Sequence, residues 1–317
     1  MRLIKKEFPF TGTEAVPSCH ASNILRLPDG SFLCAWFAGE KEGAQDVSIW
    51  VSKRENGRWS APEKIYRTEE LPHWNPVLFL QKDGAICLFY KIGATIPGWK
   101  TMVTTSRDGR NWSIPRELVA GDASGGRGPV RNHPIYLTSG KLLAPASTEK
   151  GGWEDGVWLP FVDIYREEKG WEKVAIPTEP TVKMIQPTLW EWAPDQVCAM
   201  MRTDQGKIYR SDSSDGGEHW CLAYPTSMSN NNSGIDCVRL QDGTLVLVCN
   251  PVEQNWGARS PISVFTSQDN GVTFQKELDL ETEENEFSYP SVVAHGKRVY
   301  VSYTHRRTAI AFCELEI

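Results

Sequence analysis

Histidine, arginine and amide side chains gather in short polar segments that flank apolar, strand-like runs of this sequence. Four of its six histidines, His20, His73, His133 and His305, occupy such segments. Histidines titrate near neutral pH and can act as general bases, whereas an arginine can bind a carboxylate through two parallel hydrogen bonds. If the fold brings these segments together, the combination predicts a pocket that binds an anionic group and moves a proton.

A repeated turn followed by an apolar strand predicts how the segments are brought together. Each copy places a tight turn between two extended runs, for example Asn23–Leu27 and Phe32–Trp36. The turns begin at residues 29, 83, 139, 195, 242 and 295. A third run follows, as in Val47–Ser52 and Lys100–Ser106, and then a second turn and a short closing run. Four strands per unit of about 50 residues are typical of a β-propeller blade.

Six copies of this unit predict an all-β, six-bladed β-propeller. The last copy has only three runs, the third being Ala309–Ile317, whereas the opening run Arg2–Phe8 has no hairpin partner of its own. We expect Arg2–Phe8 to supply the outer strand of the last blade, which closes the ring and removes an exposed sheet edge. Because propellers grow by repetition, residues 1–317 are expected to form one domain.

The composition argues against several classes of partner. The 317 residues carry 34 Lys and Arg against 40 Asp and Glu, a net charge of −6, so no nucleic-acid partner is expected. No apolar run is long enough to span a bilayer, so no membrane partner is expected. The N-terminal segment lacks the apolar core of a signal peptide, and the 8 cysteines show no zinc-binding spacing. Together they favour free thiols and a cytoplasmic protein.

Three segments fit, or nearly fit, the Ser-x-Asp-x-Gly-x-x-Trp pattern of the Asp-box. Ser213–Trp220 fits it fully, Ser267–Phe274 fits with Phe in the last place, and Ser106–Trp112 is one residue short. The three serines lie at the same point of their repeats. Asp and Ser side chains can bond turn amides, and the glycine permits a positive φ. We therefore interpret the aspartates of these boxes as structural residues.

With these boxes in register, the chain resembles the sialidase superfamily over nearly its whole length. The resemblance implies a six-bladed propeller in which three arginines bind the substrate carboxylate. It also implies a tyrosine nucleophile activated by a glutamate, and an aspartate as acid and base. Arg202 in Met-Met-Arg matches the second family arginine, Arg259 in Trp-Gly-Ala-Arg-Ser-Pro the third, and Tyr289 in Phe-Ser-Tyr-Pro-Ser-Val the tyrosine.

The chain departs from this pattern at the other catalytic positions. His20 stands where the first arginine is expected, and Gln186 stands in place of the activating glutamate. Gln186 cannot take a proton from Tyr289, and a tyrosine without a general base is a poor nucleophile at neutral pH. The family aspartate would correspond to Asp46. Ordinary sialidase chemistry is therefore not our first expectation.

In a propeller, the segment before the innermost strand and the segment after the second strand face the same end of the central axis, which we call the mouth. Any single polar residue of these segments could instead cap a strand end, but the concentration of His, Arg and amide side chains in them favours a binding site. The segments before the innermost strands hold His20, His73, Trp74, Asn75, Arg131, Asn132, His133, Gln186, Asn230, Asn231, Asn232 and Tyr289. The segments after the second strands hold Glu40, Lys91, Glu149, Arg202, Asn250, Arg259, His305 and Arg306.

These residues favour a carbohydrate-active enzyme that cleaves a glycosidic bond at a terminal acidic sugar. Arg202 and Arg259 would hold the carboxylate of a uronate and so acidify the adjacent carbon. His73 or His133 would remove that proton while Tyr289 protonates the leaving oxygen, which is β-elimination. The set of residue types also resembles that of propeller-fold uronate lyases, including enzymes that release terminal L-rhamnose from glucuronic acid.

The remaining candidates are residues expected to contact the substrate, an acidic oligosaccharide or glycoside. They are His20, Asp46, Trp74, Asn75, Arg131, Gln186, Arg202, Asn232, Arg259, His305 and Arg306. Tryptophans can stack on sugar faces, and the candidates are Trp74, Trp99, Trp153, Trp158, Trp190 and Trp256. Of these, Trp74 and Trp256 lie beside mouth positions.

No cofactor is expected, and no metal ion, because no acidic cluster has the spacing of metal ligands. The glycine-rich segment 121–128 is interpreted as a mobile loop near the mouth. Two alternatives to the lyase stay open. One is an exo-sialidase-like hydrolase with a different base, and the other is a propeller that binds a glycan or a protein without catalysis.

Overall fold

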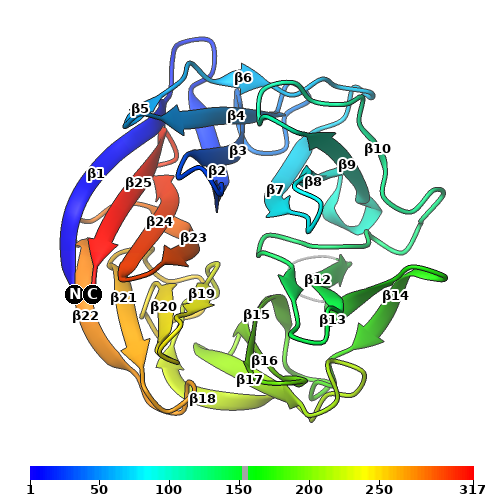
Figure 1. Ribbon diagram of the computed structural model, residues 1–317, viewed down its shortest axis with the longest axis vertical. Coiled ribbons are helices and arrows are strands. Elements are labelled where there is room, and N and C mark those ends of the chain that lie inside the picture. The colour runs from blue at the N-terminus through cyan, green and yellow to red at the C-terminus, as the bar shows by residue number, and fades with distance from the viewer. Residues whose placement is uncertain (152–155) are drawn as a thin grey trace.

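The computed structural model describes residues 1–151 and 156–317, whose strands form six antiparallel sheets around a common axis (Figure 1). Each sheet is one blade. The six-bladed, all-β propeller predicted from the repeats is therefore confirmed. No helix in the described part of the chain is both long enough and apolar enough to cross a membrane.

The first three blades are built in chain order, with the innermost strand first. Blade I consists of β2 (Ser18–Arg26), β3 (Phe32–Gly39), β4 (Ser48–Glu55), β5 (Arg58–Trp59) and β6 (Glu63–Lys64), the last two both pairing with β4. Blade II consists of β7 (His73–Leu80), β8 (Ile86–Ile92), a 3₁₀ helix η1 (Ile96–Gly98), β9 (Lys100–Ser106) and β10 (Arg116–Glu117). Blade III consists of β11 (Ile135–Tyr136), β12 (Leu142–Lys150), β13 (Val157–Arg166) and β14 (Gly170–Ala175).

The second half of the ring follows the same order until the last blade. Blade IV consists of β15 (Met184–Ala193), β16 (Gln196–Thr203), β17 (Lys207–Ser213) and β18 (Tyr224–Ser229). Blade V consists of β19 (Asp236–Arg239), β20 (Leu245–Cys249), β21 (Ile262–Ser267) and β22 (Gln275–Glu281). Blade VI consists of β23 (Phe287–His295), β24 (Arg298–His305), β25 (Ala309–Glu316) and β1 (Arg2–Thr11).

The two ends of the chain close the ring within blade VI. Strand β1 pairs with β25 from Arg2 opposite Glu316 to Thr11 opposite Ala309. Figure 1 shows β1 beside β25, with the N- and C-termini adjacent. The predicted role of the opening run is confirmed, and the closure leaves the last blade without a missing edge strand.

The core consists of apolar layers between adjacent blades. In one layer, Leu33 and Ile49 of blade I pack with Leu78 and Leu88 of blade II. Strand β3 is buried along its whole length, because a neighbouring blade covers each of its faces. All eight cysteines are free, and seven of them are buried in these layers.

The Asp-boxes are structural turns, as predicted. In the box after β17, Gly217 N–H donates to Ser213 Oγ (2.9 Å), and His219 N–H donates to Asp215 Oδ1 (3.0 Å). The box after β21 repeats this arrangement, with Gly271 N–H donating to Ser267 Oγ (2.8 Å). Each of these turns follows the third strand of its own blade, so strand direction places them at the end of the axis opposite to the mouth.

The glycine-rich segment 121–128 is fastened to the blades, contrary to its interpretation as a mobile loop. Arg127 donates from Nε and Nη2 to the two carboxylate oxygens of Asp163 (2.8 and 2.6 Å). Lys91 Nζ donates to the carbonyl oxygen of Arg127 (2.8 Å) and to Thr101 Oγ1 (2.7 Å). Burial lowers the pKa of Lys91 to about 7. These bonds anchor the segment between blades II and III.

Candidate active site at the mouth

One non-glycine residue per blade adopts a left-handed backbone conformation near the mouth end of the innermost strand. These residues are Ala21, Asn75, Arg131, Gln186, Asn232 and Tyr289, with φ between 43° and 74°. In four blades the strand pairing shifts register at this residue, so the strand carries a bulge that re-aims its side chains. Such conformations cost on the order of 1–3 kcal/mol each and concentrate at functional sites. Their sixfold recurrence makes the mouth the candidate functional site.

A cavity of about 370 Å³ opens at the mouth, and every blade contributes to its wall. Mixed polar and aromatic walls of this kind are typical of small-ligand sites. We call it the mouth cavity, and it is lined by Glu42, Trp74, Asn75, Ile96, Trp99, Glu149, Ile185, Gln186, Arg202, Trp256, Arg259, Tyr289 and Arg307.

Arg202, at the end of β16, is buried and forms no ion pair with a carboxylate of the described residues. It is 2% exposed. Its Nη1 donates to Tyr289 Oη (2.8 Å) and Gln186 Oε1 (3.2 Å), and its Nε donates to Asn232 Oδ1 (3.0 Å). These acceptors are neutral, and no carboxylate of the described residues forms an ion pair with Arg202. A buried guanidinium held by neutral oxygens leaves its charge available to an anionic ligand.

Two further arginines of the mouth cavity share one carboxylate. Arg259 Nη1 and Arg307 Nε both donate to Glu286 Oε1 (2.7 and 2.5 Å), and Arg307 Nη1 also donates to Glu42 Oε2 (2.6 Å). Arg259 lies in the loop between β20 and β21, which the segment before β19 holds in place: Asn231 Nδ2 donates to the carbonyl of Ala258 (2.6 Å). The mouth cavity therefore contains three guanidinium groups, of which only two have acidic partners among the described residues.

Arg307 lines the mouth cavity, whereas the sequence predicted its neighbour Arg306 as a substrate contact. The turn between β24 and β25 has φ of 56° and 58° at Arg306 and Arg307, and Thr308 N–H donates to the carbonyl of His305 (3.2 Å). Two positive φ values define a hairpin turn that normally requires Asn or Gly. This turn directs Arg306 outward to Glu283 and Arg307 into the cavity. The sequence signal that could have found Arg307 is an Arg-Arg pair at two turn positions where a hairpin favours Asn-Gly.

Three arginines surround the ring of Tyr289. Its ring centroid is 5.2 Å from Arg131 Cζ, 5.6 Å from Arg202 Cζ and 5.5 Å from Arg259 Cζ. The His20 ring packs against it with centroids 4.1 Å apart. Three guanidinium groups close to this ring favour the binding of an anionic ligand beside it.

His20 and Arg131 form a buried layer beneath Tyr289. Burial lowers the pKa of His20 well below its usual value, and nearby arginines lower it further, so this histidine is neutral. Its Nδ1 lies 2.8 Å from Thr304 Oγ1. Arg131 is 1% exposed, and burial lowers its pKa to about 10. Both residues support the site from below rather than lining the cavity.

Glu149, at the end of β12, is the titratable carboxyl on the wall of the mouth cavity that has no ion pair among the described residues. Burial raises its pKa to about 7, with Arg202 as the opposing influence. A carboxyl with this pKa can give or take a proton near neutral pH. The sequence placed Glu149 at the mouth but assigned it no role, because its burial could not be read from the repeat.

Neither histidine predicted as the base reaches the mouth cavity. His73 Nδ1 accepts a hydrogen bond from Ile49 N–H (3.4 Å), and burial lowers its pKa to about 3. His133 Nε2 lies 2.8 Å from the carbonyl of Ile24, and its ring faces a separate axial cavity of about 410 Å³ that Asp236 also lines. The structure therefore does not bring either predicted histidine base to the wall of the mouth cavity.

Besides His20 and Arg131, three more of the predicted substrate contacts lie outside the lining of the mouth cavity as the described residues form it. Asp46 Oδ2 accepts a hydrogen bond from Glu40 N–H (2.8 Å) and so shapes the loop between β3 and β4. His305 packs beside Phe8 with ring centroids 5.1 Å apart. Arg306 pairs with Glu283. By contrast, Trp74, Asn75, Gln186, Arg202, Arg259 and Tyr289 line the cavity, and Asn232 bonds to Arg202.

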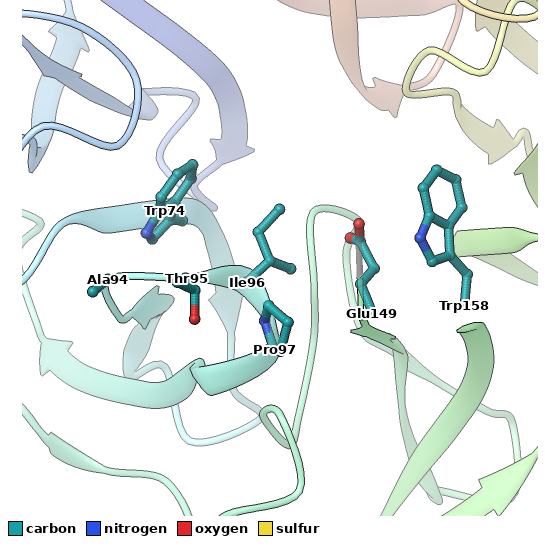
Figure 2. A pocket seen from close by; sticks show the side chains of 8 residues that line it. Trp74, Ala94, Thr95, Ile96, Pro97, Glu149 and Trp158 are labelled. Atoms are coloured by element: carbon teal, nitrogen blue, oxygen red, sulfur yellow. The ribbon is translucent and has the colours of Figure 1, made fainter. Parts of the chain in front are cut away.

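The tryptophans divide between the site and the core. Trp74, Trp99 and Trp256 line the mouth cavity, and Trp256 is 46% exposed, with its ring centroid 5.8 Å from Arg202 Cζ. Trp158 lines an adjoining cavity (Figure 2). Trp190 is a core residue whose Nε1 donates to Asn270 Oδ1 (2.7 Å). Trp153 lies outside the described residues.

Fold, Asp-boxes and mouth together define a propeller of the sialidase superfamily. The BNR repeat-like domain matches residues 30–301, and the chain belongs to this family. A search of curated proteins found no match.

Solved structures with this fold include sialidases. A protein of unknown function from Dyadobacter fermentans superposes with a TM-score of 0.81 at 17% identity, covering 100% of this chain and 99% of that one. The NanB sialidase from Streptococcus pneumoniae gives 0.76 at 12% identity, covering 98% of this chain and 70% of that one. Trypanosoma rangeli sialidase gives a TM-score of 0.73 at 12% identity, and the match covers 95% of this chain and 55% of that one. At such identities the likeness shows the fold alone.

Proposed function

We propose that this protein binds a terminal anionic sugar in the mouth cavity and hydrolyses its glycosidic bond. The observation that carries the proposal is Arg202, a buried guanidinium with neutral partners in a cavity that Arg259 and Arg307 also line. A ligand carboxylate would supply the missing negative charge, and arginine can bind it in a bidentate manner. The sialidases among the structural neighbours support a role in processing or binding a glycoside.

The positions of the two histidines favour hydrolysis over β-elimination. The elimination route required His73 or His133 as base, and both lie away from the mouth cavity. Tyr289 stays in the site, with its Oη bonded to Arg202 (2.8 Å), and Glu149 provides a titratable carboxyl on the same wall. A phenol and a carboxyl near a bound sugar suit acid-assisted cleavage of a glycosidic bond.

Gln186 favours a second candidate, a propeller that binds the acidic sugar without cleaving it. Its Oε1 accepts a hydrogen bond from Arg202 (3.2 Å), and its side chain cannot take up a proton. If no other group activates the site, the arginines would still bind a carboxylate while turnover is absent.

Turnover assays with acidic and neutral glycosides test the proposal. We expect release of the fluorophore from a fluorogenic sialoside or glucuronide, none from the matching galactoside, and no near-ultraviolet absorbance from glucuronate-containing oligosaccharides. Arg202→Met should abolish the release, whereas Arg306→Ala, outside the cavity, should not. Saturable binding of the acidic sugar without turnover would favour the second candidate. Neither binding nor turnover would contradict both.

A further inference from the structure

A second cavity of about 270 Å³ adjoins the mouth cavity and shares Trp74, Ile96 and Glu149 with it. Figure 2 shows Ile96 and Pro97 on one side and Trp158 on the other, with the Glu149 carboxyl group between them. Thr95 contributes an exposed side chain to the same wall. We call it the side cavity.

The walls of the side cavity suit a ring rather than an ion. Trp74, Ile96, Pro97 and Trp158 are apolar, and the charged groups that mark the mouth cavity are absent from its described wall except for Glu149. Aromatic faces stack on the apolar faces of sugar and aryl rings. The mouth cavity therefore suits the anionic end of a substrate, and the side cavity suits the uncharged ring bonded to it.

We propose that the side cavity binds the leaving group, a second sugar ring or an aromatic aglycone, and that Glu149 donates the proton to the glycosidic oxygen. The inference rests on the proposed function, because it requires the anionic sugar in the mouth cavity. A substrate that fills both cavities must cross the wall that they share. Glu149 is the titratable group on that shared wall, so the bond between the two halves of the substrate lies beside its carboxyl group.

The surroundings of Glu149 favour its protonated form. No hydrogen bond or ion pair from the described residues reaches its carboxyl group, and burial raises its pKa to about 7 against the opposing charge of Arg202. The other charged groups of the mouth cavity have ion-pair partners: Arg259 pairs with Glu286, and Arg307 pairs with Glu42 and Glu286. An anionic sugar bound to Arg202 would offset the cation that opposes protonation, so substrate binding itself strengthens the proton donor.

The step balances with water as the co-reactant. The bond between the anomeric carbon and the glycosidic oxygen breaks, and its electron pair stays on the oxygen, which takes the proton of Glu149 and leaves as a hydroxyl. Water adds to the anomeric carbon and gives one proton to the Glu149 carboxylate, which restores the acid. The products are the free acidic sugar and the alcohol or phenol from the side cavity.

Leaving-group dependence tests the role of Glu149 as proton donor. Glu149→Gln should lower kcat on a sugar-linked acidic substrate by about 10²–10⁴-fold. An activated aryl glycoside leaves without protonation, so its kcat should fall less than tenfold. Glu40→Gln, an exposed residue after the second strand of blade I and outside the cavity, is the matched control. Equal losses on both substrates would overturn the role, since a merely structural effect does not depend on the leaving group.

A bulky residue at Thr95 tests the side cavity. The Thr95 side chain is exposed and makes no capping hydrogen bond at η1, so Thr95→Trp should fold. We expect KM for a sugar-linked substrate to rise at least tenfold while the free acidic monosaccharide still binds. Val272→Trp, on an exposed turn after β21, controls for an added tryptophan. An unchanged KM in Thr95→Trp would overturn the assignment of the side cavity.

These assays distinguish a failure of the proposed hydrolysis from a failure of the roles given to Glu149 and the side cavity. If the wild-type protein cleaves neither substrate, the proposed hydrolysis fails and the inference fails with it. If the wild-type protein cleaves both substrates but the Glu149 and Thr95 variants behave as their controls do, only the inference fails.

Discussion

Replacing Glu149 by Gln should stabilise the protein above neutral pH and leave its stability unchanged in acid. In the folded protein the pKa of Glu149 is raised from 4.5 to about 7, because burial disfavours the carboxylate. A raised carboxyl pKa means that the folded protein loses stability as pH rises from the unfolded value toward the folded one. Glutamine carries no charge at any pH, so the variant escapes this loss.

The size of the effect follows from the two pKa values. At 1.36 kcal/mol per pKa unit, the change from 4.5 to about 7 corresponds to about 3 kcal/mol at full strength. Because the side chain is partly accessible from the cavity, solvent screening reduces this figure, and we expect about 2 kcal/mol. The difference between Glu149→Gln and wild type should therefore be near zero below pH 4.5 and reach its maximum above pH 7.

Thermal or urea unfolding of both proteins between pH 4 and pH 8.5 measures this difference. We expect the two curves to coincide in acid and to separate by several degrees in melting temperature at pH 8. Glu40→Gln, whose carboxyl group is exposed, should follow the wild type at every pH. A constant difference in stability between Glu149→Gln and wild type, or a difference that grows toward low pH, would refute the conclusion that burial disfavours the ionised form of Glu149.

Three further predictions concern the elements around the site. Arg306→Asn should stabilise the protein by about 0.5–1 kcal/mol in urea unfolding, because asparagine tolerates the positive φ that arginine adopts at a cost; a destabilised variant would contradict the strained turn. Asp163→Asn should destabilise the protein by about 3 kcal/mol in the same assay, because the Arg127 guanidinium loses its buried partner and the 121–128 segment loses its anchor. An unchanged unfolding midpoint would show that other contacts hold the segment. Arg307→Ala should raise the Kd for an acidic sugar at least tenfold in calorimetric titration and weaken the salt dependence of binding, whereas an unchanged Kd would remove Arg307 from the site.

The fold could be predicted from the sequence because it repeats. Turn pairs such as Asp29-Gly30 and Asp242-Gly243 recur at the same point of each blade, and a hairpin between apolar runs leaves little freedom in pairing. The closure by Arg2–Phe8 followed from counting strands. The same repeat placed Gln186, Arg202, Arg259 and Tyr289 at one mouth, which the cavity bears out.

Roles within the site could not be predicted in the same way, because they depend on burial and on backbone direction. His73 follows the same repeat as Asn75, but a bulge at Asn75 turns the strand, so His73 faces the layer between the blades. Arg306 and Arg307 are adjacent, and only the shape of their turn decides which one enters the cavity. Glu149 became a candidate acid only once the structure showed its burial.

The claim on which the account depends is that the arginines of the mouth bind the carboxylate of a sugar. A crystal structure of the protein with bound sialic or glucuronic acid tests it most directly. We expect a carboxylate oxygen about 2.7–3.2 Å from a guanidinium nitrogen of Arg202, between Arg259 and Arg307. A sugar bound only in the axial cavity beside His133, or bound at the mouth with its carboxylate turned away from Arg202, would contradict it.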